Sequence, residues 1–575
     1  THPDRMISLQ ELNLEEVGLD IEFKSMLFST GQVFGFPVDL KVVTLQLQQD
    51  MRDDWYRDAL GYTDIFSDHE YVADVVLNCL NSWGGQYYGD HRTVRPIPKK
   101  KHAERYSLET DVFDRFVYQA VCTFLAPNLD SALSHRVLSY RVNRGAEDTK
   151  YLFRNKISKW LDYEGLTYRF VANKGALAAT DVSNFFENVS AKQVVSALHM
   201  AVERVAASGY RKGQMLSAVR LLERLFERWT LNGEFGLPQN RDCSSFLSNV
   251  LLSQVDFEMQ KRGYDYYRYV DDIRVVCADE HEARRSLQVL ISLLRDVGMN
   301  INSTKTDVLS YDSPISLIGE HFPSQNELVL AIASMWKSRS RRVFIRSIEY
   351  IIAILKEALE TGDTQSRTFR FAVNRISQLI EAKLFDVESD DSKALMKYAL
   401  STLSDDAVSS DQLCKLILVL EPEPEVLSNI ELFLLARETC IHDWQNHKLW
   451  LLLAALRFEG DGLKELAKTV LAEDPSTGEA AGVMIWLQSV GYLDPVEGLI
   501  DTYTDSWPFQ NQRYFLIAIG AMPADKLNKL NGKVPEKLIG TTNRSKKSFR
   551  EDGVAISKRE QPSFKALYED IKDYS

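Results

Sequence analysis

The spacing of apolar positions along this chain of 575 residues changes near residue 325. From about residue 91 to residue 320, short runs of β-branched residues alternate with helical segments, which predicts an α+β or α/β domain. One helix is expected from Glu282 to Val297, where leucines recur on one face and Gly298 follows as a stop. Residues 1 to about 90 have a largely helical and irregular pattern.

After about residue 325, apolar residues recur at helical spacing in one segment after another, separated by Gly, Pro, Asp and Ser. Nine helices are expected, at Ser347–Leu359, Phe369–Glu381, Lys393–Leu403, Gln412–Leu420, Val426–Glu438, Lys448–Leu456, Leu463–Leu471, Glu479–Val490 and Arg513–Ile519. The pattern predicts stacked helical pairs, as in a short solenoid, although no clean sequence period is present. Residues 540–561 are expected to be a flexible polar tail.

Composition indicates a well-packed protein of two or three domains, because 45% of the residues are hydrophobic and the chain exceeds one ordinary core. No apolar stretch is long enough to span a membrane and no signal pattern is present, so a cytoplasmic protein is expected. The six cysteines form no Cys-x-x-Cys pair and should be reduced. The net charge of -13 disfavours a nucleic-acid partner, but basic residues gather at 91–105 and 337–346.

Two adjacent acids, Asp271 and Asp272, lie in the middle of the apolar run from Tyr266 to Cys277. The β-branched residues on both sides predict a tight β-hairpin that presents the two carboxylates at its turn. Taken alone, an adjacent pair of aspartates is usually a solvated turn. The pair gains weight from a third acid upstream.

That third acid, Asp181, ends a run of small residues and is followed by the aromatics Phe185 and Phe186. The ordinary interpretation is a helix N-cap at Asp181 or Ser183. The alternative is a metal ligand at a strand end, because nucleotide transfer to a primer hydroxyl uses two divalent cations that clamp the attacking and leaving oxygens. Carboxylate oxygens suit Mg²⁺, with Mn²⁺ as the alternative, and three acids from two strands would supply them.

Two further segments have ordinary explanations when each is taken alone. The segment Gly236-Leu-Pro-Gln leads into a helix with apolar residues from Phe246 onward, as in any loop-to-helix junction. Lys305 follows the helix that Gly298 ends, and most lysines lie at the surface. Their fixed order relative to the three acids gives both segments weight.

In that order, the segments resemble the motifs of the reverse transcriptase family, over roughly residues 91–320. Motifs A, B, C and D are matched at 181–186, 236–249, 269–272 and 298–306, and Leu317-Ile-Gly319 resembles the primer-grip hairpin. The segment from Arg95 to Arg105, with Asp114-Arg115 and Tyr140-Arg141, resembles the fingers. The resemblance implies an α+β fold with a right-hand palm and fingers, followed by an all-α domain of helical repeats.

Three domains are therefore expected. Residues 1–90 would be a largely helical extension of the fingers, and residues 91–320 would be the fingers and palm. Residues 321–575 would form a HEAT-like or thumb-replacing helical domain.

The resemblance also implies a role for each matching residue. Asp181, Asp271 and Asp272 would hold the metal ions, helped by the carbonyl of Val182. Phe186 would lie under the sugar of the incoming nucleotide and exclude a 2′-hydroxyl, so that dNTPs are the substrates. A packing role is the more common fate of an aromatic residue after a strand.

The other implied residues contact the base and the phosphates. Gln239 would lie beside the incoming nucleotide. Arg105 and one lysine of the Lys99, Lys100 and Lys101 run would bind the triphosphate, because Arg can grip phosphate oxygens bidentately. Lys305 would protonate the pyrophosphate leaving group.

The chain departs from the family pattern at motif B, where Asn240 replaces the usual Gly of Pro-Gln-Gly. After residue 320 it shows no pattern of a retroviral RNase H, an integrase or a His-Asn-His endonuclease. This combination resembles the bacterial abortive-infection and unknown-group reverse transcriptases of antiviral defence. That resemblance implies a homo-oligomer or a complex with a partner defence protein, and DNA synthesis that is protein-primed or uses a non-coding RNA. Tyr568 and Tyr574 in the tail are candidate priming residues, although packing or surface roles are more common.

Two rival interpretations stay open. One is a retron or group II intron-type enzyme that copies its own RNA, which the long helical C-terminus disfavours. The other is a catalytically silent scaffold that binds RNA or protein. Three intact acids argue against the scaffold, because clustered carboxylates are costly without a metal ion.

Overall fold

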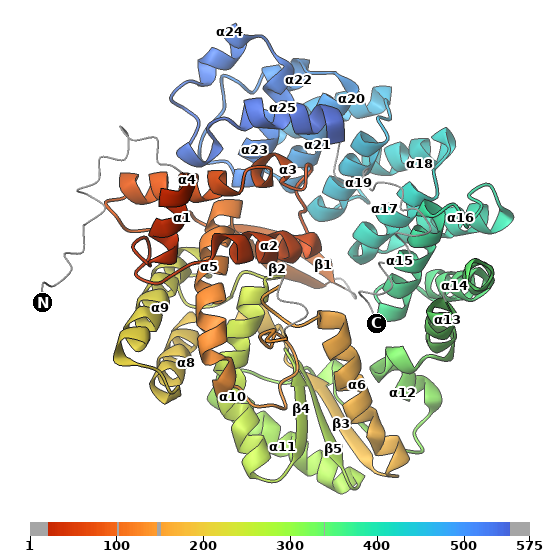
Figure 1. Cartoon of the computed structure of the whole chain (residues 1–575). Helices are drawn as coiled ribbons and strands as arrows, with labels where there is room; N and C mark the ends of the chain where they lie inside the picture. Colours follow the sequence, from red (N-terminus) through yellow and green to blue (C-terminus); the bar gives the residue numbers. More distant parts are fainter. Residues whose placement is uncertain (1–20, 100–102, 146–150, 339, 553–575) are drawn as a thin grey trace, which may run out of the picture. The chain divides into compact units, whose positions relative to one another are not determined.

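The sheet that carries two of the predicted motifs has four antiparallel strands in the order β4-β5-β3-β6 (Figure 1). In this computed structural model, which describes residues 21–99, 103–145, 151–338 and 340–552, the strands are β3 (Ala176–Asp181), β4 (Asp265–Tyr269), β5 (Asp272–Cys277) and β6 (Asp307–Ser310). The hairpin predicted at residues 266–277 is confirmed as β4 and β5. The strand predicted to end at Asp181 is confirmed as β3.

Every residue of β3 is buried, and helices pack against the sheet because its apolar side chains must be covered. The packing helices are α6 (Lys156–Ala172), α10 (Asp242–Lys261) and α11 (Glu280–Asp296). The helix predicted at 282–297 is confirmed as α11, whose buried face includes Leu287, Leu290 and Leu294.

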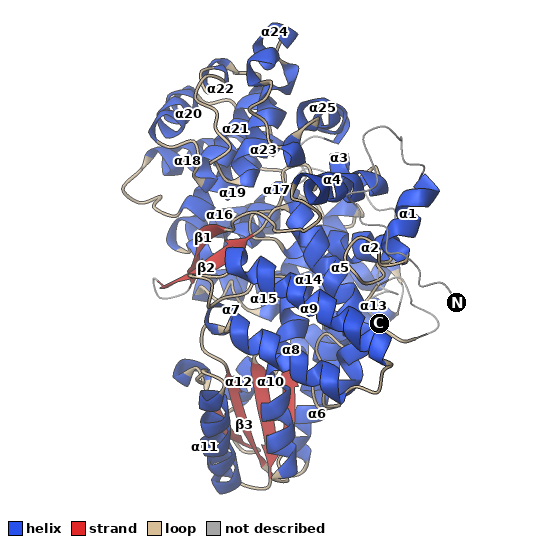
Figure 2. Ribbon diagram, turned by 90° about the vertical axis from the view of Figure 1, so that its left-hand side faces the viewer, coloured by secondary structure: helices blue, strands red, loops and turns tan. Residues whose placement is uncertain are grey.

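Further helices precede, separate and follow these strands in the chain (Figure 2). They are α1 (Ile21–Ser29), α2 (Leu40–Asp50), α4 (His69–Ser82), α5 (Val112–Leu129), α7 (Phe185–Asn188), α8 (Ala191–Arg204), α9 (Gly209–Trp229) and α12 (Ile315–His321), with a 3-10 turn, η2 (Met51–Asp53), after α2. Helix α8 packs on both α9 and α10, and α5 packs on α2 and α9. Nearly all of α5 is buried. A short two-stranded sheet contains β1 (Thr93–Lys99) and β2 (Ala103–Glu109).

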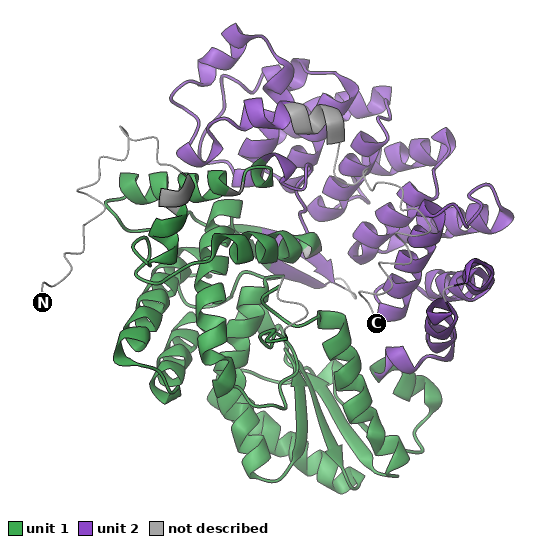
Figure 3. Cartoon of the chain, viewed as in Figure 1, with its two compact units in different colours: residues 1–54, 65–94, 107–321 green, residues 55–64, 95–106, 322–575 purple. Residues whose placement is uncertain are grey.

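The chain divides into two compact units (Figure 3). The palm unit comprises the described residues up to 54, residues 65–94 and residues 107–321, and the helical unit comprises residues 55–64, residues 95–106 and the described residues from 322 onward. This division differs from the three consecutive domains expected from the sequence. Two early segments, 55–64 and 95–106, group with the C-terminal helices instead of with the fingers and palm.

Buried polar contacts explain why these early segments belong to the helical unit. Arg513 is fully buried and forms ion pairs with Asp58 and Asp64, at 2.7 Å each. Arg95 donates a hydrogen bond from Nη2 to Oδ1 of Asn511 at 2.8 Å, and its guanidinium lies 4.9 Å from the centre of the Tyr56 ring. The sequence offered no local sign of pairings between residues more than 400 positions apart.

Between residues 341 and 518, the long helices of the helical unit form two rows, in which each helix packs on the next but one in the chain. The helices of this unit are α13 (Glu327–Lys337), α14 (Arg341–Thr361), α15 (Arg367–Glu381), α16 (Asp390–Asp405), α17 (Ser410–Val419), α18 (Pro424–Leu435), α19 (Asp443–Ala455), α20 (Asp461–Glu473), α21 (Gly478–Val490), α23 (Phe509–Ala518) and α25 (Thr541–Asp552), with short turns at α3 (Thr63–Phe66), α22 (Asp494–Glu497) and α24 (Ala524–Leu527). One row contains α14, α16, α18 and α20, and the other contains α15, α17, α19, α21 and α23. Each of the nine predicted helices overlaps one of these helices.

Two local predictions are wrong. The primer-grip hairpin predicted at Leu317-Ile-Gly319 is part of helix α12, because the amide of Ile318 bonds to the carbonyl of Pro314 and Ile318 is buried on one face. The flexible tail predicted at 540–561 is helical from Thr541 to Asp552, and α25 packs on α23. The rest of that tail, with Tyr568 and Tyr574, lies outside the described residues.

Candidate active site

The hairpin turn between β4 and β5 presents Asp271 and Asp272 with a strained backbone. Val270, just before them, has φ of 57°, which is rare for a β-branched residue. Its amide donates to the Ser139 hydroxyl at 2.9 Å, and its carbonyl accepts from Arg268 Nη1 at 2.8 Å. Such a conformation persists only when surrounding contacts hold it, and it is typical of functional sites.

The third acid lies directly beside this turn. Antiparallel pairing of β3 with β5 places Asp181 opposite Asp272, and the amide of Val182 donates to the carbonyl of Asp271 at 3.2 Å. The carbonyl of Asp181 accepts from the amide of Asn302 at 2.8 Å. Asp181 and the adjacent pair Asp271 and Asp272, about ninety residues later in the sequence, therefore meet at one end of the sheet.

Their closeness is visible in the proton affinity of Asp271. Loss of surrounding water raises the pKa of Asp271 to about 7, and repulsion from Asp272 and then Asp181 adds to the rise. The charge of Lys305 acts in the opposite direction. A shift of this cause and size is typical of clustered carboxylates at functional sites.

Lys305 lies where motif D was predicted and contacts the acids. Its Nζ donates to Oδ2 of Asp181 at 2.5 Å, although most of the lysine side chain is exposed. Partial loss of water around the charged end of the side chain lowers the pKa of Lys305. The hydrogen bond and charge of Asp181, followed by the charges of Asp272 and Asp271, outweigh that effect and raise the pKa. Lys305 is therefore protonated beside the three carboxylates.

The three predicted metal ligands have the chemistry that a divalent cation requires. Asp181 is buried, and its Oδ1 has no hydrogen-bond partner among the described residues. A buried oxygen without a partner is expected where a cation binds. Among the described residues, however, no group of three or more His, Cys, Asp or Glu side chains is arranged to hold a metal ion. Lys305 occupies the other oxygen of Asp181. The structure brings the three predicted carboxylates together, and their role as metal ligands stays a prediction.

Motif A contacts motif B through the backbone. The carbonyl of Phe186 accepts from the amide of Leu237 at 2.9 Å, and the carbonyl of Val189 accepts from the amide of Gly236 at 2.9 Å. Gly236 has φ of 93°, and a Cβ there would lie 2.7 Å from a methyl of Leu108. Because the Leu108 methyl is the end of a flexible side chain, it is mainly the positive φ that favours glycine at this position. The Phe186 ring is half-buried, at the same junction.

The motif B departure has a backbone explanation. Asn240 has φ of 53°, the left-handed region that glycine adopts freely and that asparagine tolerates better than most residues. The exchange of Gly for Asn therefore preserves the turn. Gln239, just before it, is buried in the palm unit, with 6% of its surface exposed.

The predicted triphosphate-binding residues and the three acids belong to different units. Lys99 and Arg105 lie on β1 and β2, in the part of the chain that groups with the helical unit. Arg105 is half-buried, and its guanidinium lies 5.1 Å from the centre of the Trp55 ring. Lys100 and Lys101 fall outside the described residues.

Sequence reasoning missed the residues that hold the turn of the Asp271–Asp272 hairpin. Arg268 is fully buried and pairs with the equally buried Asp256, with Nη2 and Oδ2 2.6 Å apart. Its Nη1 donates both to Val270 and to Oδ1 of Asn249, on the motif B helix. An arginine in the middle of the apolar run before Asp271 was the available signal, because a buried arginine needs partners.

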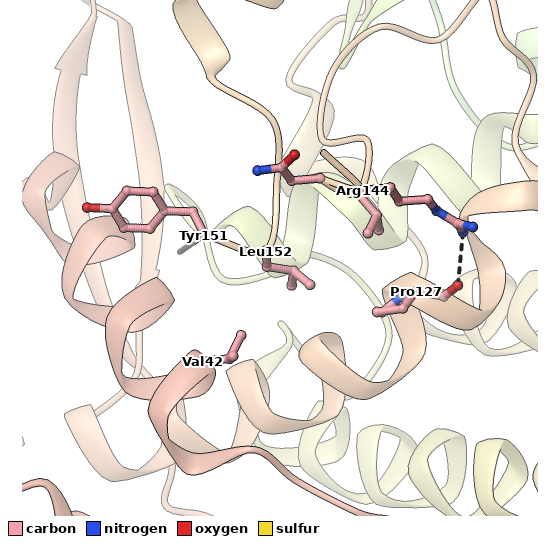
Figure 4. Close-up of a pocket in the computed structure, with 7 residues that line it drawn as sticks. Val42, Pro127, Arg144, Tyr151 and Leu152 are labelled. Carbon is pink, nitrogen blue, oxygen red and sulfur yellow. Dashed lines mark hydrogen bonds between the residues drawn. The ribbon is translucent and has the colours of Figure 1, made fainter. Parts of the chain in front are cut away.

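A cavity of about 380 Å³ lies elsewhere in the palm unit (Figure 4). Val42, Pro127, Arg144, Tyr151 and Leu152 are among its lining residues, and Arg144 donates to the carbonyl of Pro127 at 3.2 Å. None of the three acids lines it. The cavity is therefore separate from the candidate active site.

Comparison with known proteins gives a class that agrees with this geometry. Residues 97–322 match the family model described as Reverse transcriptase (RNA-dependent DNA polymerase), so this part of the chain is similar to that family. The matched segment includes all three acids, Phe186, Gln239 and Lys305. None of the helices described here is both long and apolar enough to cross a membrane.

Individual relatives are distant. The chain is 26% identical over 132 residues to the Retron Ec86 reverse transcriptase of Escherichia coli, a match that covers 22% of this chain and 36% of that protein. A solved structure of telomerase from Candida albicans in complex with a TWJ fragment of telomeric RNA is 13% identical, with a TM-score of 0.28. That comparison covers 66% of this chain and 70% of the telomerase chain.

Proposed function

We propose that this chain is an RNA-directed DNA polymerase that adds dNTPs to the 3′ end of a primer. The observation that supports the proposal best is the pairing of Asp181 with Asp272 on neighbouring strands, with Asp271 at the adjoining turn. These residues lie inside the segment that matches the reverse transcriptase family model. The retron relative is itself a reverse transcriptase, which agrees with the proposal.

In this proposal the three carboxylates, with the carbonyl of Val182, hold divalent cations, most simply Mg²⁺. Bound cations would lower the energy of charge that develops on the attacking and leaving oxygens. Lys305 protonates the pyrophosphate oxygen that leaves, and its contact with Asp181 supports this role. Gln239 contacts the incoming nucleotide, and Lys99, Lys100 and Arg105 bind its phosphates.

Primer extension by the full chain tests the function directly. Purified protein is incubated with a labelled primer on an RNA template, Mg²⁺ and all four dNTPs, and the products are sized. Template-dependent extension is expected. A parallel reaction without template, followed by protease treatment, detects protein-primed synthesis. No incorporation in either reaction, with Mg²⁺ or with Mn²⁺, would refute the polymerase assignment.

The side chain of Phe186 should set the choice of sugar. In Phe186→Ala, the bulk that excludes a 2′-hydroxyl is removed, so ribonucleotides should enter. We expect the preference for dNTP over rNTP, measured as the ratio of kcat/KM values, to fall roughly a hundredfold. The matched control is Phe186→Tyr, which keeps the ring and should keep the preference. Equal discrimination in the Ala variant and the wild type would mean that Phe186 only packs.

We further propose a role in bacterial antiviral defence, as in the abortive-infection reverse transcriptases that the chain resembles. The support is a reverse transcriptase domain followed, in the described residues, by a unit of packed helices. Phage plating on cells that express the wild type should fall, and plating on cells that express Asp271→Asn with Asp272→Asn should not. Equal plating on both strains would contradict this role.

The partners follow from the same proposal. They are dNTPs, the nucleic acid product, a template RNA, and other copies of the chain or a partner defence protein. The retron alternative predicts one structured RNA that copurifies with the protein and is joined to its DNA product. Sequencing of the copurified nucleic acid separates the two interpretations.

A further inference from the structure

The turn that carries Gln239 contacts the C-terminal end of helix α2, which lies far earlier in the chain. Helix α10 begins at Asp242, directly after this turn, and the preceding residue, Arg241, provides no side-chain cap. The amide of Asp242 instead donates to Oδ1 of Asp50 at 2.7 Å. Asp50 is the last residue of α2, 192 positions earlier in the chain. A carboxylate at a helix N-terminus is stabilising, and here it is supplied by another helix.

The same segment also binds the side chain of the turn. Nη1 of Arg241 lies 2.6 Å from the second oxygen of Asp50, and Nη2 of Arg241 contacts Asp54. All three side chains are almost completely buried. Since a buried charge without its partner is costly, this arrangement leaves Arg241 no alternative position.

Two branches extend this contact to other parts of the palm unit. On one side, Asp54 pairs with Arg115, which pairs with Glu109 at the end of β2 at 2.6 Å. On the other side, Asp242 pairs with Lys156 at 2.8 Å. The backbone carbonyl of Lys156 accepts from the hydroxyl of Tyr269, the first residue of motif C, at 2.9 Å. The network thus joins α2, motif B and the catalytic hairpin.

The charges in this network are unequal. It contains four carboxylates and three cations, namely Asp50, Asp54, Glu109 and Asp242 against Arg115, Lys156 and Arg241. Burial raises the pKa of Asp50 to about 7, opposed by Arg241 and reinforced by Asp242. Neutralisation of Asp50 would leave the network balanced, so the fold should tolerate an asparagine there. Arg241 and the Asp242 amide donate to different oxygens of Asp50, however, so the NH2 group of an asparagine must face one of these two donors and lose that hydrogen bond.

We infer that Asp50 and Asp54 are positioning residues for nucleotide binding, which act through Arg241 to fix the turn that carries Gln239. The inference depends on the proposed function, because it assumes that this turn contacts the incoming nucleotide. It also gives the Arg241-Asp242 pair, which directly follows the Asn240 departure in motif B, a specific role. The side chain of Arg241 and the amide of Asp242 bind the carboxylates of Asp50 and Asp54.

The test compares Asp50→Asn with the wild type in the full chain. A misplaced contact should raise the KM for dNTP by about tenfold and change kcat less. Hydrogen exchange at the amides of residues 241–245 should become faster. The matched control is Asp39→Asn at the other end of α2, where the exposed Asp39 caps its own helix and asparagine caps equally well. The control should leave both measurements unchanged.

Arg241→Lys provides a second route to the same result. Lysine keeps the charge but cannot bridge two carboxylates, so this variant should also raise the KM for dNTP. If Asp50 acts through Arg241, the two substitutions together should raise KM by less than the product of the separate changes. Should Asp50→Asn fail to fold, the KM of Arg241→Lys decides the question alone.

The possible results are distinct. An unchanged KM in Asp50→Asn overturns the inference, whether or not hydrogen exchange becomes faster, because faster exchange alone describes a merely structural contact. Independent, multiplicative effects of the two substitutions also overturn it. Absence of incorporation by the wild type itself would instead refute the proposed polymerase function.

Discussion

Replacing both Asp271 and Asp272 by asparagine should reduce nucleotide incorporation about a thousandfold or more while the fold is retained. Asparagine has nearly the same volume as aspartate, so packing at the hairpin turn is preserved. The substitution removes two negative charges that would bind cations, whose contribution to the barrier is several kcal/mol, and each 1.36 kcal/mol is tenfold in rate. Single-turnover primer extension measures the loss.

Stability should not fall in this double variant. The pKa of Asp271 is raised by loss of water and by the neighbouring carboxylates, which means that its charged form is disfavoured in the folded protein. Asp279→Asn is the matched control, because Asp279 lies beyond the other end of β5 and caps α11 through the amide of Glu282. Near-normal incorporation by a double variant that melts like the wild type would exclude these acids from the chemistry.

The second large effect is expected for Arg268→Met, which should destabilise the palm unit by about 3–5 kcal/mol. Methionine fills similar space but leaves Asp256 as an unpaired charge in a fully buried site. It also releases the carbonyl of Val270, so the strained turn that presents Asp271 should relax and incorporation should fall. Urea unfolding monitored by hydrogen exchange of β4 and β5 measures the change.

Arg136→Met serves as the control, because its ion-pair partner lies on the same hairpin. Arg136 pairs with Asp265 at 2.8 Å, but both side chains are about 30% exposed. An ion pair that remains in contact with water contributes at most about 1 kcal/mol, so the control should be nearly as stable as the wild type. Equal destabilisation by both substitutions would show that burial of the Arg268 pair has no special importance.

Much of the palm could be predicted because its signals are local. Alternation of apolar residues defined the hairpin around Asp271, and helical periodicity defined α11 and the helices of the C-terminal unit. Periodicity also failed in identifiable places. Leu317-Ile-Gly319 is too short a run to distinguish a strand from the single buried face of α12. Residues 541–552 are almost all polar and show no apolar periodicity, yet they form α25, which packs on α23.

The rest of the site depends on contacts that no local pattern contains. Asp50 and Arg241 are 191 positions apart, and each would be an ordinary surface residue in isolation. The turn at Asn240 is easier to explain from the sequence, because asparagine tolerates the left-handed backbone that the usual glycine would adopt. The residue after this departure from the family pattern, Arg241, is the one with the distant partner.

The ion pairs of Arg513 bear on how the protein is made. Asp64 and Arg513 are 449 positions apart, so these pairs form only after synthesis has passed Arg513 and that residue has left the ribosome. Until then, two acids that are buried in the finished molecule remain in water. A shortened gene that stops after the polymerase-like segment would leave these acids, and the residues around Arg95, permanently without their partners. Expression of that segment alone should therefore give a poorly soluble product.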